Sequence, residues 1–301
     1  MDILKDLCHI TGEENVLTDE LMSGHTTFRI GGPADFFVTP EKKEQIGQII
    51  ELCCGRNIPY YIVGNGSNLL VGDRGYRGVI IQVFKKMNQI RAEGEKIYAQ
   101  AGALLSKVAA AALEASLTGL EFASGIPGTL GGALRMNAGA YGGEMKQVTE
   151  SAQVLTPDGE ILVIPVDELG MSYRTSVISR NDYVVLEAVL KLHRGSQEEI
   201  RARMEELKEK RVSKQPLEYG SAGSTFKRPE GYFAGKLIED AGLRGFRVGD
   251  AQVSEKHCGF VINRGAATAA EVAQLMDQVR MRVKEKFGVD LEPEVKRIGE
   301  F

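Results

Sequence analysis

Arg174 stands in a short segment whose polar side chains could bind an anion. It follows an aromatic residue and lies between hydroxyl residues in MSYRTS (171–176), away from any run of charges. The planar guanidinium of an arginine can hold a carboxylate or a phosphate through two parallel hydrogen bonds. A surface arginine explains the segment equally well, so Arg174 alone does not define a site.

A second segment, SAGSTFKRP (221–229), could present a serine hydroxyl. Ser224 follows Gly223 in a sequence typical of a tight turn, which would display its side chain. The segment lacks the G-x-S-x-G pattern of a nucleophile elbow, and no histidine–acid pair is evident, so acyl transfer is disfavoured. A serine that only shapes a turn explains this pattern as well.

A third segment, LEPEVKRIG (291–299), carries two carboxylates, Glu292 and Glu294. We expect a strand over residues 289–298, and a two-residue step along a strand puts both side chains on one face. Carboxylates on an edge strand usually face solvent, so this pair by itself defines no site either.

The longest unusual stretch is SGIPGTLGGALRMNAGAYGG (124–143), in which seven residues are glycine and Arg135 is the single charge. Glycine is costly in helices and strands, so such a run favours close approach of the backbone to a ligand, with N–H groups turned toward an anion. A flexible linker is the alternative, but linkers are polar, whereas this run carries several large apolar residues.

A second small-residue loop follows the expected strand 60–63 and reads GNGSNLLV (64–71). A strand that leads into such a loop is a phosphate-binding arrangement, because small residues let several N–H groups face one anion. The G-x-G-x-x-G pattern would need glycine at Leu69, so a Rossmann dinucleotide site is not supported.

One further motif is rejected. GYFAGKL (231–237) resembles a Walker A loop, but it has three intervening residues instead of four. Leu237 also replaces the Ser or Thr whose hydroxyl would bind magnesium, which argues against a nucleotide triphosphatase.

Taken together, these segments resemble one family. In order along the chain, they are similar to motifs of the UDP-N-acetylenolpyruvoylglucosamine reductases, flavoenzymes of bacterial cell-wall synthesis: HTTFRIGGPAD (25–35), GNGSNLL (64–70), SGIPGTLGGALRMNAGAYGG (124–143), SYRTS (172–176), SAGSTFKRP (221–229) and LEPEVKRIG (291–299). The resemblance runs from about His25 to Gly299. It implies an α+β FAD-binding fold of the vanillyl-alcohol-oxidase type, made of two α+β subdomains, plus a separate α+β substrate domain.

The resemblance also implies roles for individual residues. The family's catalytic arginine, serine and glutamate fall on Arg174, Ser224 and Glu294. Implied flavin contacts are Gly64, Asn65, Gly66, Ser67, Asn68, Leu69, Ser124, Gly125, Ile126, Pro127, Gly128, Gly131, Gly132, Asn137, Ala138 and Gly139. Implied substrate contacts are Lys214, Arg228 and Lys296. No extra tyrosine-bearing loop follows Arg174, so the chain looks like the shorter form of the family.

The implied reaction uses FAD and NADPH to reduce the enolpyruvyl group of the UDP-sugar to the lactyl ether of UDP-N-acetylmuramate. An alternative is another FAD-dependent oxidoreductase or oxidase of the same fold, acting on a hydroxy acid or a sugar. A nucleotide-binding sensor without catalysis is a third hypothesis, which a colourless protein that takes up no FAD would favour.

Composition limits the other classes of function. The 301 residues are 26% charged with a net charge of −4, which gives no broad basic surface for nucleic acid. No apolar run approaches the length of a membrane span, and the N-terminal MDILKDLCHITGEEN resembles no export signal. The four cysteines form no C-x-x-C pattern and the four histidines lack ligand spacing, so we expect a cytoplasmic protein with reduced thiols and no metal site. We also favour a monomer.

The expected elements alternate between strands and helices, which suggests an α+β protein with mixed sheets. We expect a helical lead-in over 1–24, helices over 41–56, 104–117, 196–211, 232–241 and 268–287, and strands over 34–38, 60–63, 78–83, 96–101, 151–156, 160–165, 183–192 and 289–298. Thr268 and Glu271 form a capping-box pattern at the start of the last helix. The resemblance suggests FAD-binding subdomains over 1–85 (to which 295–301 returns) and 86–212, and a substrate domain over 213–294.

Overall fold

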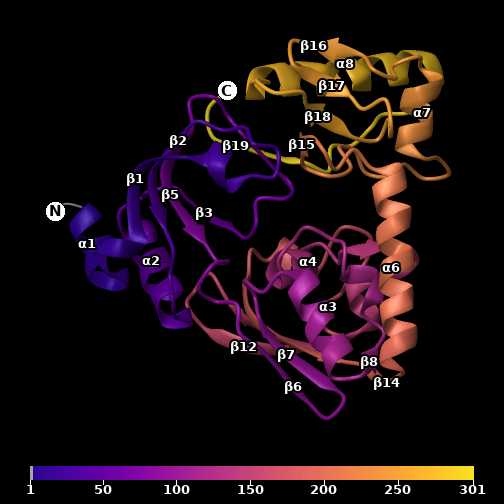
Figure 1. Cartoon of the computed structure of the whole chain (residues 1–301). Helices are drawn as coiled ribbons and strands as arrows, with labels where there is room; N and C mark the ends of the chain where they lie inside the picture. The colour runs from indigo at the N-terminus through magenta and orange to yellow at the C-terminus, as the bar shows by residue number, and fades with distance from the viewer. Residues whose placement is uncertain (1–2) are drawn as a thin grey trace. The chain divides into compact units, whose positions relative to one another are not determined.

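The computed structural model describes residues 3–301, and Figure 1 labels its elements. The chain divides into two compact units. The first contains residues up to 17, 36–65 and 79–211, and the second contains residues 18–35, 66–78 and 212–301. Each unit has its own hydrophobic core, so the two are described separately.

Two helices and a four-stranded sheet begin the fold. The helices are α1 (Ile3–Thr11) and α2 (Lys43–Gly55), and the sheet has the strand order β1 (Val16–Leu21), β2 (Pro33–Val38), β5 (Tyr76–Gln82), β3 (Tyr60–Val63). In α2 the buried residues Ile46, Ile49, Ile50 and Cys53 recur at helical spacing and therefore share one face. Strand β3 pairs in parallel with β5 and ends at the first glycine loop.

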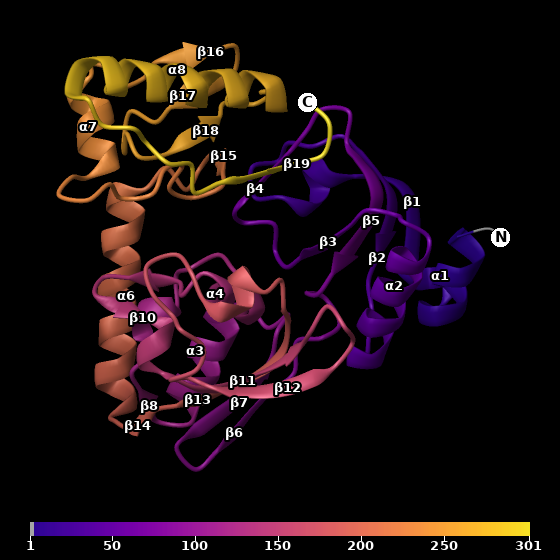
Figure 2. The same ribbon diagram turned by 180° about the vertical axis from the view of Figure 1, so that it is seen from behind.

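A second, five-stranded antiparallel sheet completes the core of the first unit. Its order is β12 (Ile161–Pro165), β11 (Thr149–Leu155), β13 (Val184–Lys191), β7 (Lys96–Gln100), β6 (Ile90–Glu93). Helices α3 (Leu105–Glu114) and α4 (Leu130–Arg135) lie over one face of this sheet, as Figure 2 shows. The predicted hairpin between β11 and β12 is confirmed.

Smaller elements link these parts. They are the strand pairs β8 (Leu117–Thr118) with β14 (His193–Arg194) and β9 (Gly139–Ala140) with β10 (Gly143–Glu144), helix α5 (Val177–Arg180), and 3₁₀ turns at Glu13–Asn15, Met22–His25, Glu121–Ala123 and Met145–Gln147. Helix α6 (Gln197–Lys214) is mostly exposed and buries only Ile200 and Leu207, as its charged sequence predicts.

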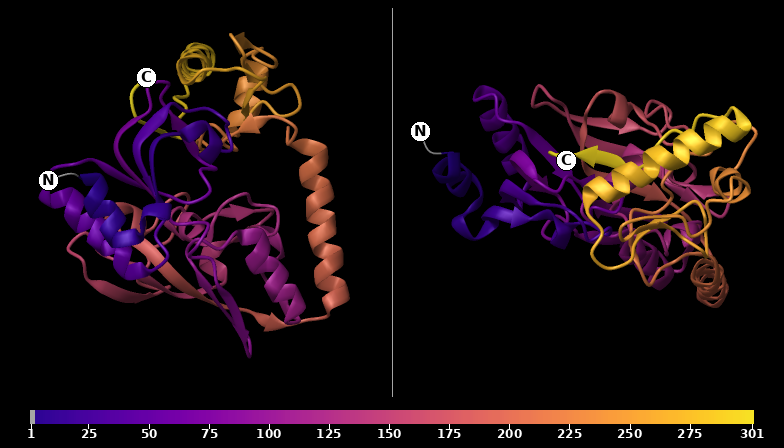
Figure 3. Two further views of the ribbon diagram at one scale, coloured as in Figure 1. Left: turned by 60° about the vertical axis from the view of Figure 1, so that its left-hand side comes forward. Right: turned by 90° about the horizontal axis from the view of Figure 1, so that it is seen from above.

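The second unit is built on a four-stranded antiparallel sheet. Its order is β15 (Gly220–Ser221), β18 (Val261–Asn263), β17 (Ala251–Val253), β16 (Arg247–Val248). Helices α7 (Ala234–Asp240) and α8 (Ala269–Phe287) pack together, and α8, the long yellow helix seen from above in Figure 3, lies against β16 and β17. Strand β4 (Leu69–Val71) pairs in parallel with β19 (Lys296–Ile298) in the same unit.

Side chains from two segments accept hydrogen bonds from the first turn of α8. The Thr268 hydroxyl accepts a hydrogen bond from the Glu271 N–H, which confirms the predicted capping box. The Asp73 carboxylate also accepts from the N–H groups of Ala269 and Ala270, at 2.7 and 2.9 Å. These bonds satisfy backbone donors that every helix leaves unpaired in its first turn.

Two expected elements are wrong. The helical lead-in over 1–24 ends at Thr11, because Gly12 follows with φ +91°, and β1 occupies part of the remainder. The strand over 289–298 is reduced to β19, with one isolated bridge at Pro293 before it. Hydrogen bonds from the Lys227 N–H to Glu292 and from the Glu294 N–H to Thr225 flank that bridge, so the pairing is local.

Among the helices that the structure describes, each is too short or too polar to cross a membrane.

Candidate active site

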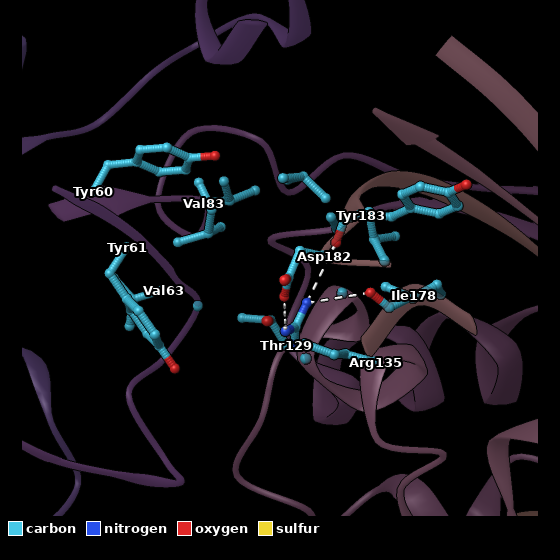
Figure 4. A pocket seen from close by; sticks show the side chains of 16 residues that line it. Tyr60, Tyr61, Val63, Val83, Thr129, Arg135, Ile178, Asp182 and Tyr183 are labelled. Carbon is cyan, nitrogen blue, oxygen red and sulfur yellow. Dashed lines mark hydrogen bonds and ion pairs between the residues drawn. The ribbon is translucent and has the colours of Figure 1, made fainter. Parts of the chain in front are cut away.

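A cavity of about 400 Å³ lies in the first unit, and Figure 4 shows the side chains around it. Strand β3 and its following glycine contribute one wall, while α4, the segment after α5 and the start of β13 contribute the other. The lining residues are Tyr60, Tyr61, Ile62, Val63, Gly64, Val83, Ala101, Thr129, Gly131, Gly132, Arg135, Ile178, Asp182, Tyr183, Val184 and Val185.

The two glycine-rich stretches meet at this cavity, at Thr129. A Cβ atom added to Gly64 would lie 2.3 Å from the Thr129 Oγ1 atom, so only glycine fits there. A Cβ atom on Gly132 would find only that same oxygen within 4 Å, at 3.7 Å, so Gly132 faces open space. A bulky side chain at position 132 would therefore project into the cavity.

Part of the longer stretch is a helix and not a loop. Its residues Leu130–Arg135 form α4, and the N–H groups of Leu130 and Gly131 donate to the carbonyls of Ala103 and Ala101, both at 2.8 Å. These two donors are therefore not turned toward a ligand, which corrects the expectation of an anion-binding backbone along the whole stretch. Gly131 and Gly132 leave space in the cavity because glycine has no side chain.

Several predicted flavin contacts are not part of this cavity. In the described chain, its lining leaves out Ser124–Gly128 and Asn137–Gly139. The buried Asn137 amide is bound by protein groups: its Nδ2 donates to Glu144 Oε2 at 3.0 Å and to the Ser172 carbonyl at 3.4 Å, and its Oδ1 accepts from the Lys146 N–H at 2.9 Å.

The shorter loop is fixed residue by residue. Asn65 Nδ2 donates to the Pro127 carbonyl at 2.7 Å, which ties this loop to the longer stretch. Gly66 has φ +61°, and a Cβ atom there would lie 2.1 Å from the His25 carbonyl oxygen. Asn68 Nδ2 donates to the Glu294 carbonyl at 3.1 Å. The loop has little freedom to accept larger residues.

Beyond Asn68, the loop enters a strand. Ser67 is half-buried, and Leu69 is buried at the start of β4. The buried Leu69 therefore supports the end of the loop as part of a strand pair.

Arg211 contacts the longer stretch and was not predicted from the sequence. Its Nε atom lies 2.9 Å from the position of a Cβ atom on Gly125, so glycine there leaves room for the guanidinium. Burial lowers the pKa of Arg211, and a hydrogen bond with Tyr141 opposes that shift. In the sequence Arg211 is one basic residue in a charged helix, which gave no signal of this role.

Arg174 lies at a strained turn in the first unit. Its φ is +56°, and the N–H and C=O groups of Ser172 and Thr175 bond to each other across the turn. Non-glycine residues rarely adopt this conformation, and such strain is concentrated at functional sites. The Arg174 guanidinium also lies 5.1 Å from the centre of the Tyr173 ring.

Ser224 and Glu294 lie on adjoining segments of the second unit. The Glu294 N–H donates to the Thr225 carbonyl at 2.9 Å, and Thr225 is held by β18 through its hydroxyl, which accepts from the Val261 N–H. Ser224 itself is half-buried after Gly223, which has φ +74°. Glu294 is thus paired with Thr225, which is the residue that follows Ser224.

Glu292 and Glu294 differ in exposure, although only two residues separate them along the chain. Glu292 is exposed and pairs with Lys227, whereas Glu294 is 8% exposed. The bridge between Phe226 and Pro293 pairs this segment with the loop that carries Ser224. Of the two carboxylates, only Glu294 occupies a protected position.

The predicted substrate-binding cations are exposed in the second unit. Arg228 stacks on Phe233, with the guanidinium carbon 4.0 Å from the ring centre. Lys296 begins β19, and its N–H donates to the Asn68 carbonyl. Lys214 ends α6 near His257, whose pKa is lowered first by burial and also by the positive charge of Lys214.

Two protein-family models match parts of this chain. Residues 34–164 match a family model described as FAD binding domain, and residues 215–298 match one described as UDP-N-acetylenolpyruvoylglucosamine reductase, C-terminal domain. A curated UDP-N-acetylenolpyruvoylglucosamine reductase from Clostridium tetani is 57% identical over 99% of this chain and 97% of its own length. One from Agathobacter rectalis is 56% identical over 95% of each chain.

Solved structures agree with these matches. The UDP-N-acetylenolpyruvylglucosamine reductase from Thermus caldophilus is 38% identical, covers 93% of this chain and 97% of its own, and has a TM-score of 0.81. An alkyldihydroxyacetonephosphate synthase, 18% identical over 64% of this chain and 40% of its own, has a TM-score of 0.50 and shows a shared fold alone. The predicted fold class, an FAD-binding α+β fold with a separate substrate domain, is confirmed.

Proposed function

The chain belongs to the UDP-N-acetylenolpyruvoylglucosamine reductase family, and we propose which of its residues act in each step of the reaction. The protein reduces the enolpyruvyl group of UDP-N-acetylenolpyruvoylglucosamine to the lactyl ether of UDP-N-acetylmuramate, a step in making peptidoglycan precursors. FAD is its cofactor and NADPH its reductant. When bound, FAD supplies the redox chemistry by carrying a hydride from NADPH to the substrate.

The meeting of the two glycine-rich stretches at one cavity is the observation that carries the FAD assignment. Gly64 and Gly132 leave out side chains where a large cofactor needs close approach, and Val63, Val83, Val184 and Val185 supply apolar walls. We assign the predicted flavin contacts of residues 64–69 and 124–139 to this cofactor. We also assign 1–85 and 86–212 to its two subdomains and 213–294 to the substrate.

We assign Arg174 to the negative charge that forms during reduction. Hydride addition to the terminal methylene carbon leaves a carbanion at the adjacent carbon, which the substrate carboxylate delocalises. A fixed positive charge at that carboxylate stabilises the transition state more than the ground state. The strained turn at Arg174 supports this role, because backbone strain is concentrated at functional sites.

Ser224 is assigned as the proton donor that completes the reduction. Its hydroxyl is a weak acid, but the carbanion is strongly basic, and general acid catalysis needs position as well as acidity. Glu294 is assigned as its partner, hydrogen-bonding the intermediate or assisting the proton. The backbone pairing between the Ser224 and Glu294 segments supports their joint action.

The UDP-sugar and the cellular setting complete the proposal. We assign Lys214, Arg228 and Lys296 to the anionic substrate, because all three are exposed cations of the second unit. We place the protein in the cytoplasm as a monomer that uses NADPH there. Loss of its activity should then impair cell-wall biogenesis, cell shape and cell division.

Replacement of Gly132 by valine tests the FAD assignment. We expect the apparent affinity for FAD to fall at least about 10-fold, because the new side chain would fill space that the cofactor needs. The fold should persist, since a Cβ atom at position 132 meets no close neighbour. Fluorescence titration of the apoprotein with FAD measures the affinity, and the melting temperature without FAD reports the fold.

Gly47→Val is the matched control. Gly47 also lies in a helix, its Cβ position meets only Leu155 Cδ2 at 3.9 Å, and it does not line the cavity. This variant should bind FAD normally. A Gly132→Val protein that retains normal FAD affinity and activity would contradict the close-approach argument.

A further inference from the structure

The backbone N–H and carbonyl of Glu294 bond to two different segments of the second unit. The N–H donates to the Thr225 carbonyl at 2.9 Å, and the carbonyl accepts from the side-chain Nδ2 of Asn68 at 3.1 Å. We propose that the Asn68 amide positions Glu294 for the proton step of substrate reduction. Asn68 is then a positioning residue for that step, and the inference rests on the proposed function.

The chain changes its pairing partner at Glu294. Just before it, residues 292–293 pair with the loop that carries Ser224. Just after it, β19 pairs in parallel with β4, and the Lys296 N–H donates to the Asn68 carbonyl at 2.9 Å. Figure 2 labels both of these strands. Glu294 is therefore the residue that joins the two pairings.

The Asn68 side chain supplies a bond that a backbone group would supply in a regular strand pair. Ladder bonds in a parallel pair are evenly spaced. One step beyond the bond from the Lys296 N–H to the Asn68 carbonyl, the pattern would join the Asn68 N–H to the Glu294 carbonyl. The Nδ2 atom of Asn68 donates to that carbonyl. The length of this side chain therefore helps to set where the Glu294 backbone lies.

The position of the Glu294 carboxyl depends on this backbone. Glu294 is only 8% exposed, and a group that assists a proton transfer must lie within hydrogen-bond reach of the reacting atoms. Pro293 restricts the chain on one side through its fixed φ, and the Asn68 bond fixes it on the other. Loss of that bond should let Glu294 shift, and a misplacement of about 1 Å can cost about 100-fold in rate.

Asn68 also lies in the loop that we assign to FAD, which gives its amide an alternative role. The geometry favours the role at Glu294, because the two residues bond directly and both belong to the second unit. In the part of the chain that the structure describes, the cavity lining belongs to the first unit and does not include Asn68. A change of this side chain should therefore affect the substrate step more than the affinity for FAD.

Asn68→Leu tests the inference, because leucine has nearly the shape of asparagine but no N–H donor. With FAD saturating, the limiting rate of flavin reoxidation by the enolpyruvyl sugar should fall about 10- to 100-fold, at an unchanged half-saturating substrate concentration. Flavin reduction by NADPH, the affinity for FAD and the melting temperature should stay near the wild-type values. Anaerobic stopped-flow absorbance and fluorescence titration measure these quantities. Asn68→Asp also lacks the donor and should show the same pattern.

Combination with Glu294→Gln separates positioning of Glu294 from a general disturbance of the loop. Glu294→Gln removes the carboxyl but keeps the size of the side chain. In this background, Asn68→Leu should slow reoxidation by less than about 3-fold, because no carboxyl is left to position. Equal slowing by Asn68→Leu in both backgrounds would overturn the inference.

Asn88→Leu is the matched control. Asn88 is exposed in the first unit, and its Nδ2 donates to the Lys85 carbonyl at 2.9 Å, the same kind of bond. This variant should match the wild type in both half-reactions. An Asn68→Leu protein that loses affinity for FAD, yet is reoxidised at the wild-type rate when saturated, would assign the amide to the cofactor and overturn the inference. If the enolpyruvyl sugar does not reoxidise the wild type, the proposed function fails, whereas wild-type behaviour of Asn68→Leu overturns only this inference.

Discussion

Ser224→Ala is expected to lose turnover of the enolpyruvyl sugar while the bound flavin is still reduced by NADPH. Removal of a positioned general acid lowers a rate by about 10²- to 10⁴-fold, and flavin reduction does not need this proton. Ser224 is half-buried in a loop held by backbone bonds of Thr225, so alanine should not disturb the fold. Anaerobic stopped-flow absorbance measures the two half-reactions separately.

Ser221→Ala is a matched control for this experiment. Ser221 ends strand β15, just before the loop that carries Ser224, and its N–H and C=O groups pair with Thr27. This variant should carry out both half-reactions at the wild-type rate. Reoxidation of reduced Ser224→Ala by the enolpyruvyl sugar at a near-normal rate would remove Ser224 from the mechanism.

The second large effect is expected for Arg174→Lys, which should slow substrate reduction about 10²- to 10³-fold. Lysine keeps the charge but loses the planar fork that matches a carboxylate. Arginine and lysine at position 174 would be equally strained, because neither residue type favours φ +56°. The rate of flavin reoxidation by substrate measures the effect, and reduction by NADPH should be unchanged.

Arg180→Lys provides the comparison for Arg174→Lys. Arg180 is an exposed arginine of the following helix, and its conversion to lysine should leave the reoxidation rate as in the wild type. An Arg174→Lys enzyme with wild-type reoxidation would show that paired hydrogen bonds from Arg174 do not stabilise the transition state.

Much of the fold followed from local sequence. Helix α2 and helix α8 were predicted within two residues, because apolar residues recur at helical spacing in both and a capping box starts α8. Helix α4 was missed, because two of its six residues are glycine, which is a poor helix former. Its conformation depends on bonds to Ala101 and Ala103, which are distant in sequence.

The site was predictable to the extent that its residue types are unusual. Glycine at positions 64 and 132 marked the cavity, because a run of glycines needs a specific reason. Asp182 and Arg211 gave no such signal, since single charged residues in loops and surface helices are common. They come to lie beside the cavity and beside Gly125 only in the folded chain, which no local pattern encodes.

The most direct test of the whole account is the visible spectrum of the purified protein under anaerobic conditions. We predict the absorbance bands of oxidised flavin, their bleaching on addition of NADPH, and their return when UDP-N-acetylenolpyruvoylglucosamine is added. A colourless protein that takes up no FAD, or a reduced flavin that this substrate does not reoxidise, would contradict the account.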